Sequence, residues 1–342
     1  MVVKTHPKPG GGPDLLRGEL ERPAAQIVRS VESTRTVGLN PADKVAIAYL
    51  VIITSLILFS ANRIDLWWVF GAGHAVLIGL ILLVARALPI ATASGLGSSR
   101  NPSTGSSISL VLGSFIRGWY PVLLIPVTYK ELTYMIPQIH PRDFDATLAA
   151  IDYRLWGVHP TIWLERFTWP PLTEVLQLTY SCYYFVPIVL GIVLWRRETP
   201  DFYFWVFVVV LGFYVSYLGY ISVPATGPRF LPEIAKAQTV PLTGIWLFAS
   251  VREMLDRAEG ITRDCFPSGH TELSLLVLYY ARVFHKRVFW WLLPIGTGII
   301  ISTVYLRYHY LIDVVAGALV AIVIIAIAKP LYRTLGGQLE SW

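Results

Sequence analysis

Eight long apolar runs occupy most of this 342-residue chain and decide what it can fold into. Apolar stretches of about 20 residues are long enough to cross a bilayer as helices, whose backbone groups bond within the segment. The sequence therefore predicts an all-α, polytopic membrane helix bundle with about eight transmembrane helices. The expected spans are 44–61, 66–88, 118–136, 172–195, 202–223, a sixth from the 264–271 stretch to about 285, 288–306 and 309–328.

Composition agrees with a membrane protein. The chain is 54% hydrophobic and 15% charged, whereas soluble domains carry about 25% charged residues. Its 12 Trp and 18 Tyr suit aromatic belts at the two membrane interfaces. The net charge of +6 would suggest an anionic partner in a soluble protein, but membrane topology explains much of it here. We expect membrane lipids and no nucleic acid as partners.

Local composition divides the chain into four parts. Residues 1–43 are rich in Pro and Gly and predict a disordered cytoplasmic tail. Residues 44–107 predict an accessory helix pair followed by a Ser/Gly-rich linker. The catalytic membrane domain is expected over 118–330, with 331–342 as a cytoplasmic C-terminal tail. Within it, the aromatic, proline-bounded segment 140–171 favours a position in the interface plane, with a cap over the active site as the alternative.

Basic residues predict the orientation. Cytoplasmic loops of membrane proteins carry an excess of Lys and Arg. We also expect Arg117 to snorkel toward lipid headgroups at the cytoplasmic end of the span 118–136. Placing the N-terminus inside a plasma or inner membrane, with eight spans, puts both termini in the cytoplasm and the two polar stretches described below on the extracytoplasmic face. The residues that fix this orientation are Arg196, Arg197, Arg282, Lys286, Arg287, Lys329 and Arg333.

Two polar stretches stand at the mouths of apolar runs. In 264–271, the turn residues of Pro-Ser-Gly precede His270, so Ser268, Gly269 and a helix N-terminus favour an anion. In 307–313, His309 and Asp313 are four residues apart and would share one face of a helix. The alternative for this pair is a buried contact that holds two helices together.

These residues suit phosphoryl transfer. A neutral His309 can attack phosphorus with one ring nitrogen if Asp313 holds the other ring nitrogen in place. His270 then supplies a proton to the leaving alkoxide. Cations on the same face would hold the phosphate oxygens by forked hydrogen bonds, or else anchor in lipid headgroups. We expect Lys130 and the adjacent Glu131 to meet polar partners on other helices, with an anion site as one option for the lysine. The candidate phosphate-binding residues are Arg229, Arg307, Arg263, Lys130, Ser268 and Gly269.

Cys-Phe-Pro-Ser-Gly-His-Thr (265–271) and Arg-Tyr-His-Tyr-x-x-Asp-x-x-x-Gly (307–317) resemble two motifs of a known family. They are similar to the second and third motifs of the type 2 phosphatidic acid phosphatase (PAP2) superfamily, and more narrowly of its inositol phosphorylceramide synthase-like branch. The resemblance implies a six-helix core, a phospho-His309 intermediate, Asp313 as orienter, His270 as acid, and no metal or other cofactor. The sequence departs from the family's first motif, because Ser222 stands where a lysine is expected. Lys130 and Lys236 are left as candidates for the role of that lysine.

Three functions follow as hypotheses. The first is an integral membrane lipid phosphatase that hydrolyses a phospholipid, sphingolipid or isoprenoid phosphate through phosphohistidine. The second is a lipid phosphotransferase that passes the phosphoryl head group to an alcohol instead of water. The third is a non-enzymatic lipid transporter, which explains buried charges but not a nucleophile and its orienter facing an acid.

Overall fold

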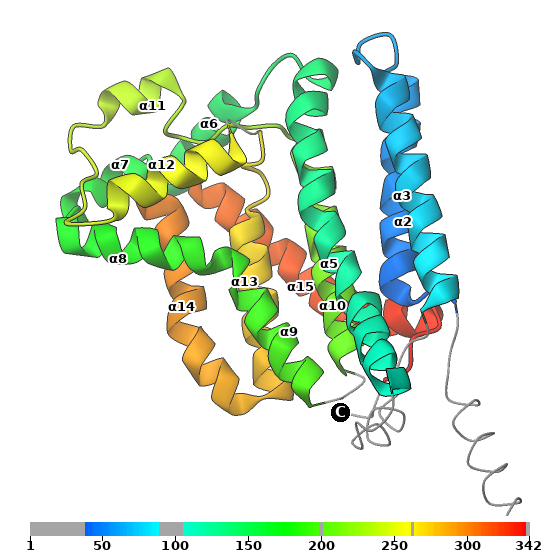
Figure 1. The fold of residues 1–342 in the computed structure, drawn as a ribbon. Coiled ribbons are helices and arrows are strands. Elements are labelled where there is room, and N and C mark those ends of the chain that lie inside the picture. Colours follow the sequence, from blue (N-terminus) through cyan, green and yellow to red (C-terminus); the bar gives the residue numbers. More distant parts are fainter. Residues whose placement is uncertain (1–37, 89–104, 198–200, 261–262, 340–342) are drawn as a thin grey trace, which may run out of the picture.

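The computed structural model describes residues 38–88, 105–197, 201–260 and 263–339, and every regular element in these ranges is helical (Figure 1). The predicted all-α class is confirmed, while most of the predicted N-terminal tail and part of the linker lie outside the described residues. The helices are α2 (Pro41–Phe59), α3 (Trp67–Ala87), α5 (Gly105–Ile139), α6 (Asp145–Trp156), α7 (Pro160–Trp163), η1 (Leu164–Phe167), α8 (Pro170–Ser181), η2 (Cys182–Tyr184), α9 (Val186–Arg196), α10 (Asp201–Ser222), α11 (Pro232–Ala237), α12 (Phe248–Glu259), α13 (Gly269–Phe284), α14 (Lys286–Tyr305) and α15 (Leu311–Thr334).

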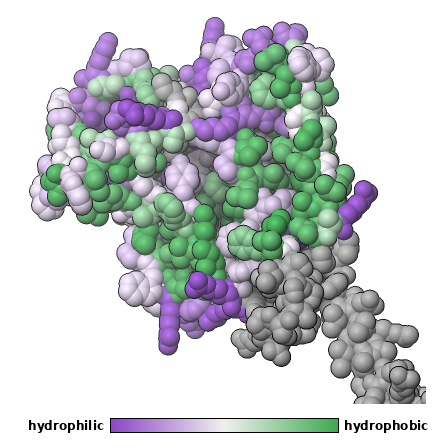
Figure 2. All heavy atoms as spheres, in the orientation of Figure 1, coloured by the Kyte–Doolittle hydropathy of each residue, from purple (hydrophilic) through white to green (hydrophobic). Residues whose placement is uncertain are grey.

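Several helices have the length and composition of membrane spans. Among the described residues, α2, α3, α10, α14 and α15 qualify, and the bent pair of α8 and α9 makes a sixth if it counts as one span. Helix α13 has only 16 residues, and α5 carries charged side chains, so the count of eight spans remains a prediction. Figure 2 shows hydrophobic residues over the middle of the bundle and hydrophilic ones toward its two ends.

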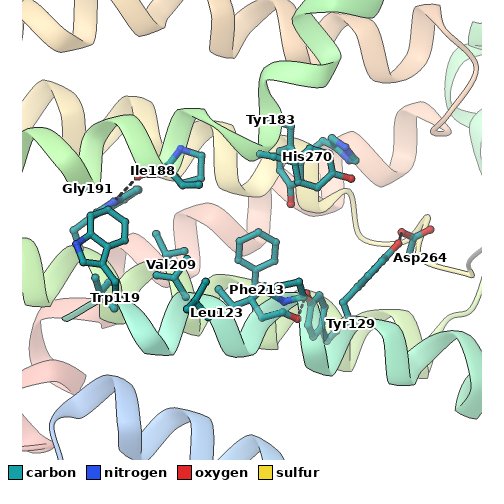
Figure 3. Close-up of a pocket in the computed structure, with 18 of the residues that line it drawn as sticks. Trp119, Leu123, Tyr129, Tyr183, Ile188, Gly191, Val209, Phe213, Asp264 and His270 are labelled. Atoms are coloured by element: carbon teal, nitrogen blue, oxygen red, sulfur yellow. Dashed lines mark hydrogen bonds between the residues drawn. The ribbon is translucent and has the colours of Figure 1, made fainter. Parts of the chain in front are cut away.

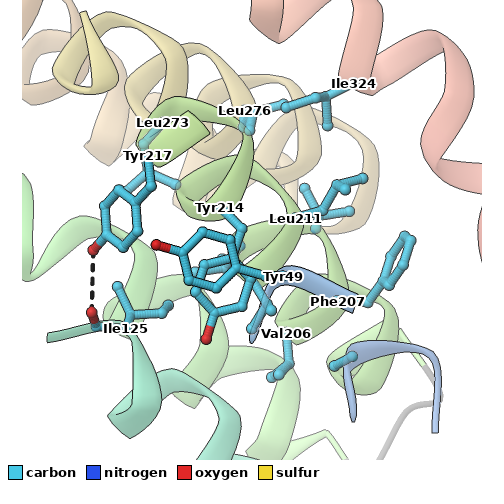
Figure 4. Packing of buried hydrophobic residues seen from close by; sticks show 14 of the residues in the cluster. Tyr49, Ile125, Val206, Phe207, Leu211, Tyr214, Tyr217, Leu273, Leu276 and Ile324 are labelled. Carbon is cyan, nitrogen blue, oxygen red and sulfur yellow. Dashed lines mark hydrogen bonds between the residues drawn. The ribbon is translucent and has the colours of Figure 1, made fainter. Parts of the chain in front are cut away.

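Helix α10 forms the centre of the bundle. In its most apolar stretch 72% of the residues are buried, against 17% in α3, which leaves most of α3 for contact with lipid. Aromatic side chains dominate the packing around it: Tyr49 of α2 stacks on Tyr214 at 4.1 Å between ring centroids (Figure 4). One turn further, the Tyr217 hydroxyl donates to the backbone carbonyl of Ile125 at 3.2 Å, which joins α10 to α5.

The predicted fourth span is not straight. Helix α8 ends at Ser181, η2 follows, and α9 leaves at 48° to the first part. Pro187 stands in the first turn of α9 and lacks the N–H that would continue the helical ladder. As a result α8 runs across the bundle while α9 follows the other long helices (Figure 1).

The sequence predicted that Arg117 snorkels toward lipid headgroups, and this prediction is wrong. Its side chain is fully buried and forms a forked contact with Asp43 of α2, with N–O distances of 3.0 and 2.5 Å. This pair ties the accessory helices to α5. Nearby, the Lys44 ammonium donates to the carbonyl of Leu335 at 2.7 Å, so α2 begins at the end of the bundle where α15 finishes.

The opposite end of the bundle is covered by short helices: α6, α7, η1, α11 and α12 (Figure 1). The segment 140–171 covers the ends of the long helices, as a cap would, and its position in the membrane interface stays a prediction. Its inward carboxylates, Asp145 and Asp152, are buried against the rest of the protein, while Trp156 and Phe167 are exposed on the outer side. The segment therefore caps the helix ends with a polar inner face and an aromatic outer face.

Candidate active site

The loop between α14 and α15 positions His309. Arg307 in this loop has a φ of 67°, in the left-handed region that side chains other than glycine rarely adopt. The reversal brings the His309 ring to Cys265, whose backbone carbonyl oxygen lies 2.8 Å from Nδ1. Because a carbonyl oxygen only accepts hydrogen bonds, Nδ1 carries the proton. The neutral ring therefore has its lone pair on Nε2.

His309 and Asp313 do not share a helix face, so that prediction is wrong in its geometry. Helix α15 begins at Leu311 with Tyr310 as its N-cap, and His309 precedes the helix. Asp313 is the third residue of α15, and its Oδ2 accepts the backbone N–H of Tyr310 at 2.8 Å. This capping geometry turns the carboxylate back over the helix N-terminus, which leaves Oδ2 3.5 Å from Nδ1 of His309.

Cys265 connects the two polar stretches, a role that was not predicted from the sequence. Its thiol donates to Oδ2 of Asp313 at 2.9 Å, while its carbonyl accepts from His309. Burial raises the pKa of this thiol well above its usual value, and the neighbouring Asp313 carboxylate adds to the shift. The thiol therefore stays protonated and acts as a donor. Its only sequence signal is its place directly before the Phe-Pro-Ser-Gly-His run.

His270 faces His309 from the first turn of α13. Its Nδ1 lies 3.4 Å from Nε2 of His309. The ring is held between Tyr180 and Tyr183, with centroid distances of 4.4 and 4.1 Å. Its other nitrogen, Nε2, is buried and makes no hydrogen bond to any described residue. The structure thus brings together the two histidines that the sequence placed 39 residues apart.

A small polar cavity of about 30 Å³ opens beside the two histidines. Arg229 lines it, as predicted for a phosphate-binding cation, and its guanidinium lies over the Tyr308 ring at 4.7 Å. Asp256 of α12 binds this guanidinium at 2.8 Å. Gly227 makes the approach possible, because its φ of 98° and its lack of a Cβ let the backbone pass against Tyr308.

Two predicted phosphate-binding arginines are not among the residues that line this cavity. Arg307 is buried beneath the cap, where it binds Glu165 of η1 and Gln238, both at 3.1 Å. Burial lowers the pKa of Arg307, and the negative charge of Glu165 partly offsets this lowering. Arg263 binds Asp143 at 2.7 Å on the side of the cap. Both arginines hold the cap in the structure as it stands.

Three other predicted residues take local positions. Ser268 is the N-cap of α13, and its hydroxyl accepts the Thr271 N–H at 3.3 Å. Gly269 follows it and packs against the Tyr220 hydroxyl, where a Cβ would collide. Lys130 is exposed and donates to the backbone carbonyl of Ala258. As the sequence predicted, Lys130 and Glu131 meet polar partners on other segments; that of Glu131 is His74 of α3, at 2.8 Å.

Carboxylates of α6 hold the loops that carry the site, a role that the sequence analysis missed. Asp145 accepts from the loop before Arg229 and from the residue that caps α15, and Asp152 caps the N-terminus of α15. The donors to Asp145 are Thr226 N–H (2.9 Å), Gly227 N–H (2.8 Å) and the Tyr310 hydroxyl (3.0 Å); those to Asp152 are Leu311 N–H and Ile312 N–H (both 2.8 Å).

Cys265, His309 and Asp313 form the one group of possible metal ligands within the described ranges. Their ligand atoms lie within 4.8 Å of one another, and all three residues are buried. The same atoms already bond to each other or to the backbone: the thiol donates to the carboxylate, and Nδ1 donates to a carbonyl. A metal ion would have to replace these hydrogen bonds.

An apolar groove of about 290 Å³ leads away from the histidines between α5, α9 and α10 (Figure 3). His270 and Asp264 line both the groove and the polar cavity, so the two spaces meet at these residues. At the other end the groove reaches Trp119 and Gly191. The arrangement suits a molecule with a polar head and a hydrocarbon chain.

A family model described as the PAP2 superfamily matches residues 146–327, so the chain belongs to this superfamily. The match covers both motifs and lies inside the predicted catalytic domain. Membership suggests a membrane lipid phosphatase or phosphotransferase. Neither the search of curated proteins nor that of solved structures gave a match.

Proposed function

We propose that the protein hydrolyses the phosphate ester of a membrane lipid through a phosphohistidine. In the first step Nε2 of His309 attacks phosphorus, the bond from phosphorus to the lipid oxygen breaks, and His270 protonates that oxygen. In the second step water attacks phosphorus, gives a proton to His270, and the bond to His309 breaks. The products are the lipid alcohol and inorganic phosphate, and His270 returns to its protonated state.

The observation that carries the proposal is the facing pair of histidines in a cavity that Arg229 also lines. The proton on Nδ1 of His309 leaves the lone pair on Nε2 for the attack, and Asp313 stabilises the positive charge that forms on the ring. Arg229, stacked on Tyr308, supplies the charge for the phosphate oxygens. The apolar groove supports a lipid as the substrate.

The test uses the full chain in detergent or nanodiscs with a ³²P-labelled lipid phosphate and a chelator. We expect inorganic phosphate as product and an acid-labile, base-stable phosphoprotein that maps to His309. His309→Ala should abolish both signals, while His285→Ala, a histidine at the far end of α13, should keep them. Turnover that survives in His309→Ala rejects the mechanism. Lipid binding by wild-type protein without turnover favours the transporter.

Transfer to an alcohol is the second candidate, because Asp264 lines the junction of the cavity and the groove. Its Oδ2 accepts the Tyr129 hydroxyl at 2.6 Å, which shows that this carboxylate is placed to accept hydrogen bonds from hydroxyl groups. An acceptor alcohol bound there would replace water in the second step, as in an inositol phosphorylceramide synthase-like reaction. A labelled phosphodiester lipid, formed in place of inorganic phosphate when alcohol is added, supports this candidate.

A further inference from the structure

The groove between α5, α9 and α10 is apolar along its length except where it meets the histidines. Its walls are aromatic and aliphatic side chains from all three helices, including Val122, Pro126, Val209 and Phe213. Its volume of about 290 Å³ is at the lower limit of ligand sites, which span roughly 300–1,000 Å³. That space suits one hydrocarbon chain better than the two chains of a diacyl lipid.

The groove opens sideways to the surface of the bundle. Leu123, Tyr184 and Ile188 line it and are also exposed, by 67%, 42% and 37%. These residues lie on the apolar outer surface of α5 and of the α8–α9 pair, where lipid would surround the protein. A chain can therefore enter laterally from the bilayer while its phosphate reaches His270.

The far end of the groove is closed by a contact between α5 and α9. The Trp119 ring lies against Gly191, where a Cβ would sit only 2.8 Å from the ring. Phe202 of α10 supports the Trp119 ring from the other side, with centroids 5.2 Å apart. In Figure 3, Trp119 and Gly191 lie at one end of the groove, and His270 and Asp264 lie at the other.

We propose that this groove binds a single hydrocarbon chain of the lipid phosphate, and that Trp119 and Gly191 set the chain length that the site accepts. The inference rests on the proposed function, because His270 fixes the head end of the chain. Each methylene added within the groove removes apolar surface from water, so kcat/KM should rise about three- to fourfold per methylene. The rise should stop at the length that reaches Trp119.

The test measures phosphate release from single-chain alkyl phosphates of increasing length, with full-length protein in nanodiscs. Wild-type kcat/KM should rise with chain length and then level off. Trp119→Ala should move that limit to longer chains. Gly191→Leu on the Trp119→Ala background, where the Trp119 ring no longer meets the new side chain, should move the limit back toward shorter chains. Trp291→Ala on α14, a tryptophan with 79% of its surface exposed, is the matched control and should keep the wild-type profile.

A second measurement separates this inference from the proposed function. Binding of the same alkyl phosphates to His309→Ala protein should show the same limit in length, because the groove is unchanged. If the wild type releases no phosphate but binding shows this limit and its shift in Trp119→Ala on the same background, the proposed function fails and the groove proposal stands. Identical length profiles for wild type and Trp119→Ala, in both turnover and binding, would overturn the groove proposal.

Discussion

Nδ1 of His270 lies 3.4 Å from Nε2 of His309, so the two rings are in direct contact across the site. A phosphoryl group does not fit between nitrogen atoms this close. Substrate must therefore approach from the polar cavity, beside Arg229, and separate the rings as it binds. The hydrogen bond from Nδ1 of His309 to the carbonyl of Cys265, and the packing of His270 against Tyr180 and Tyr183, limit how far either ring can turn.

The loss of activity on removal of the acid, His270, should depend on the leaving group of the substrate. We expect His270→Asn to lower kcat for an alkyl phosphate by about 10²- to 10⁴-fold, the usual contribution of a general acid. An aryl phosphate with an acidic phenol as leaving group needs no proton. The rate at which phosphoprotein forms from this substrate should therefore fall much less. His285→Asn is the control. Equal losses of phosphoprotein formation on both substrates would contradict the role of His270 as acid.

The thiol of Cys265 should affect both activity and stability through its hydrogen bond to Asp313. Cys265→Ala removes one of the two donors to Oδ2 of the buried Asp313 carboxylate and leaves the Tyr310 N–H, and a hydrogen bond to a charged group contributes about 1.5–3 kcal/mol. Cys265→Ser retains a donor of similar size. We expect a loss of kcat and of thermal stability in the alanine variant and recovery of most of both in the serine variant. The backbone carbonyl that binds His309 is present in each, so a complete loss in the serine variant would point to another role.

The same thiol predicts a pH dependence of stability at alkaline pH. Its folded pKa is raised above the ordinary value of 9.0, so above pH 9 the unfolded chain releases a proton that the folded protein retains. The stability contributed by Cys265 is present in full below pH 9 and is lost as the pH rises toward the folded pKa. Thermal unfolding from pH 7 to 10 should show this decline in the wild type and a smaller decline in Cys265→Ser.

The Asp43–Arg117 pair should hold the accessory helices to the core. Asp43→Asn leaves the buried guanidinium without its charge partner, and breaking such a pair costs about 3–5 kcal/mol. We expect a marked fall in thermal stability in detergent. Glu253→Gln removes a surface partner from the exposed Arg257 and should change stability little. Comparable losses in the two variants would show that the buried pair is not special.

Orientation in the membrane can be tested from two lysine positions. Lys236 lies in the cap and Lys286 at the start of α14, near the other end of the bundle. In a background with Cys265→Ser and Cys182→Ser, we expect Lys236→Cys to react with an impermeant maleimide in intact cells. Lys286→Cys should react only after the membrane is opened. The reverse pattern would place the site in the cytoplasm.

The sequence predicted the helical class, most helix positions and the two motif histidines, because these features depend on residues that are close together in the chain. Apolar runs specify helices, and a histidine after Pro-Ser-Gly stands at a helix start. The prediction failed where the partner came from elsewhere in the chain. Arg117 looked like an interfacial anchor until Asp43, 74 residues away, was found beside it. The bend in the fourth span has a local cause instead, because Pro187 lacks the N–H that would continue the helical ladder.

The sequence by itself determined that His270, His309 and Asp313 are polar residues at the ends of apolar runs. Only the tertiary structure decided how they meet: His309 lies before α15, not on it, and its nearest partner is the carbonyl of Cys265. It also decided that Arg229 lines the cavity while Arg307 holds the cap. Hydrogen bonds and ion pairs select partners by distance in space, and residue spacing along a chain fixes that distance only within one regular element.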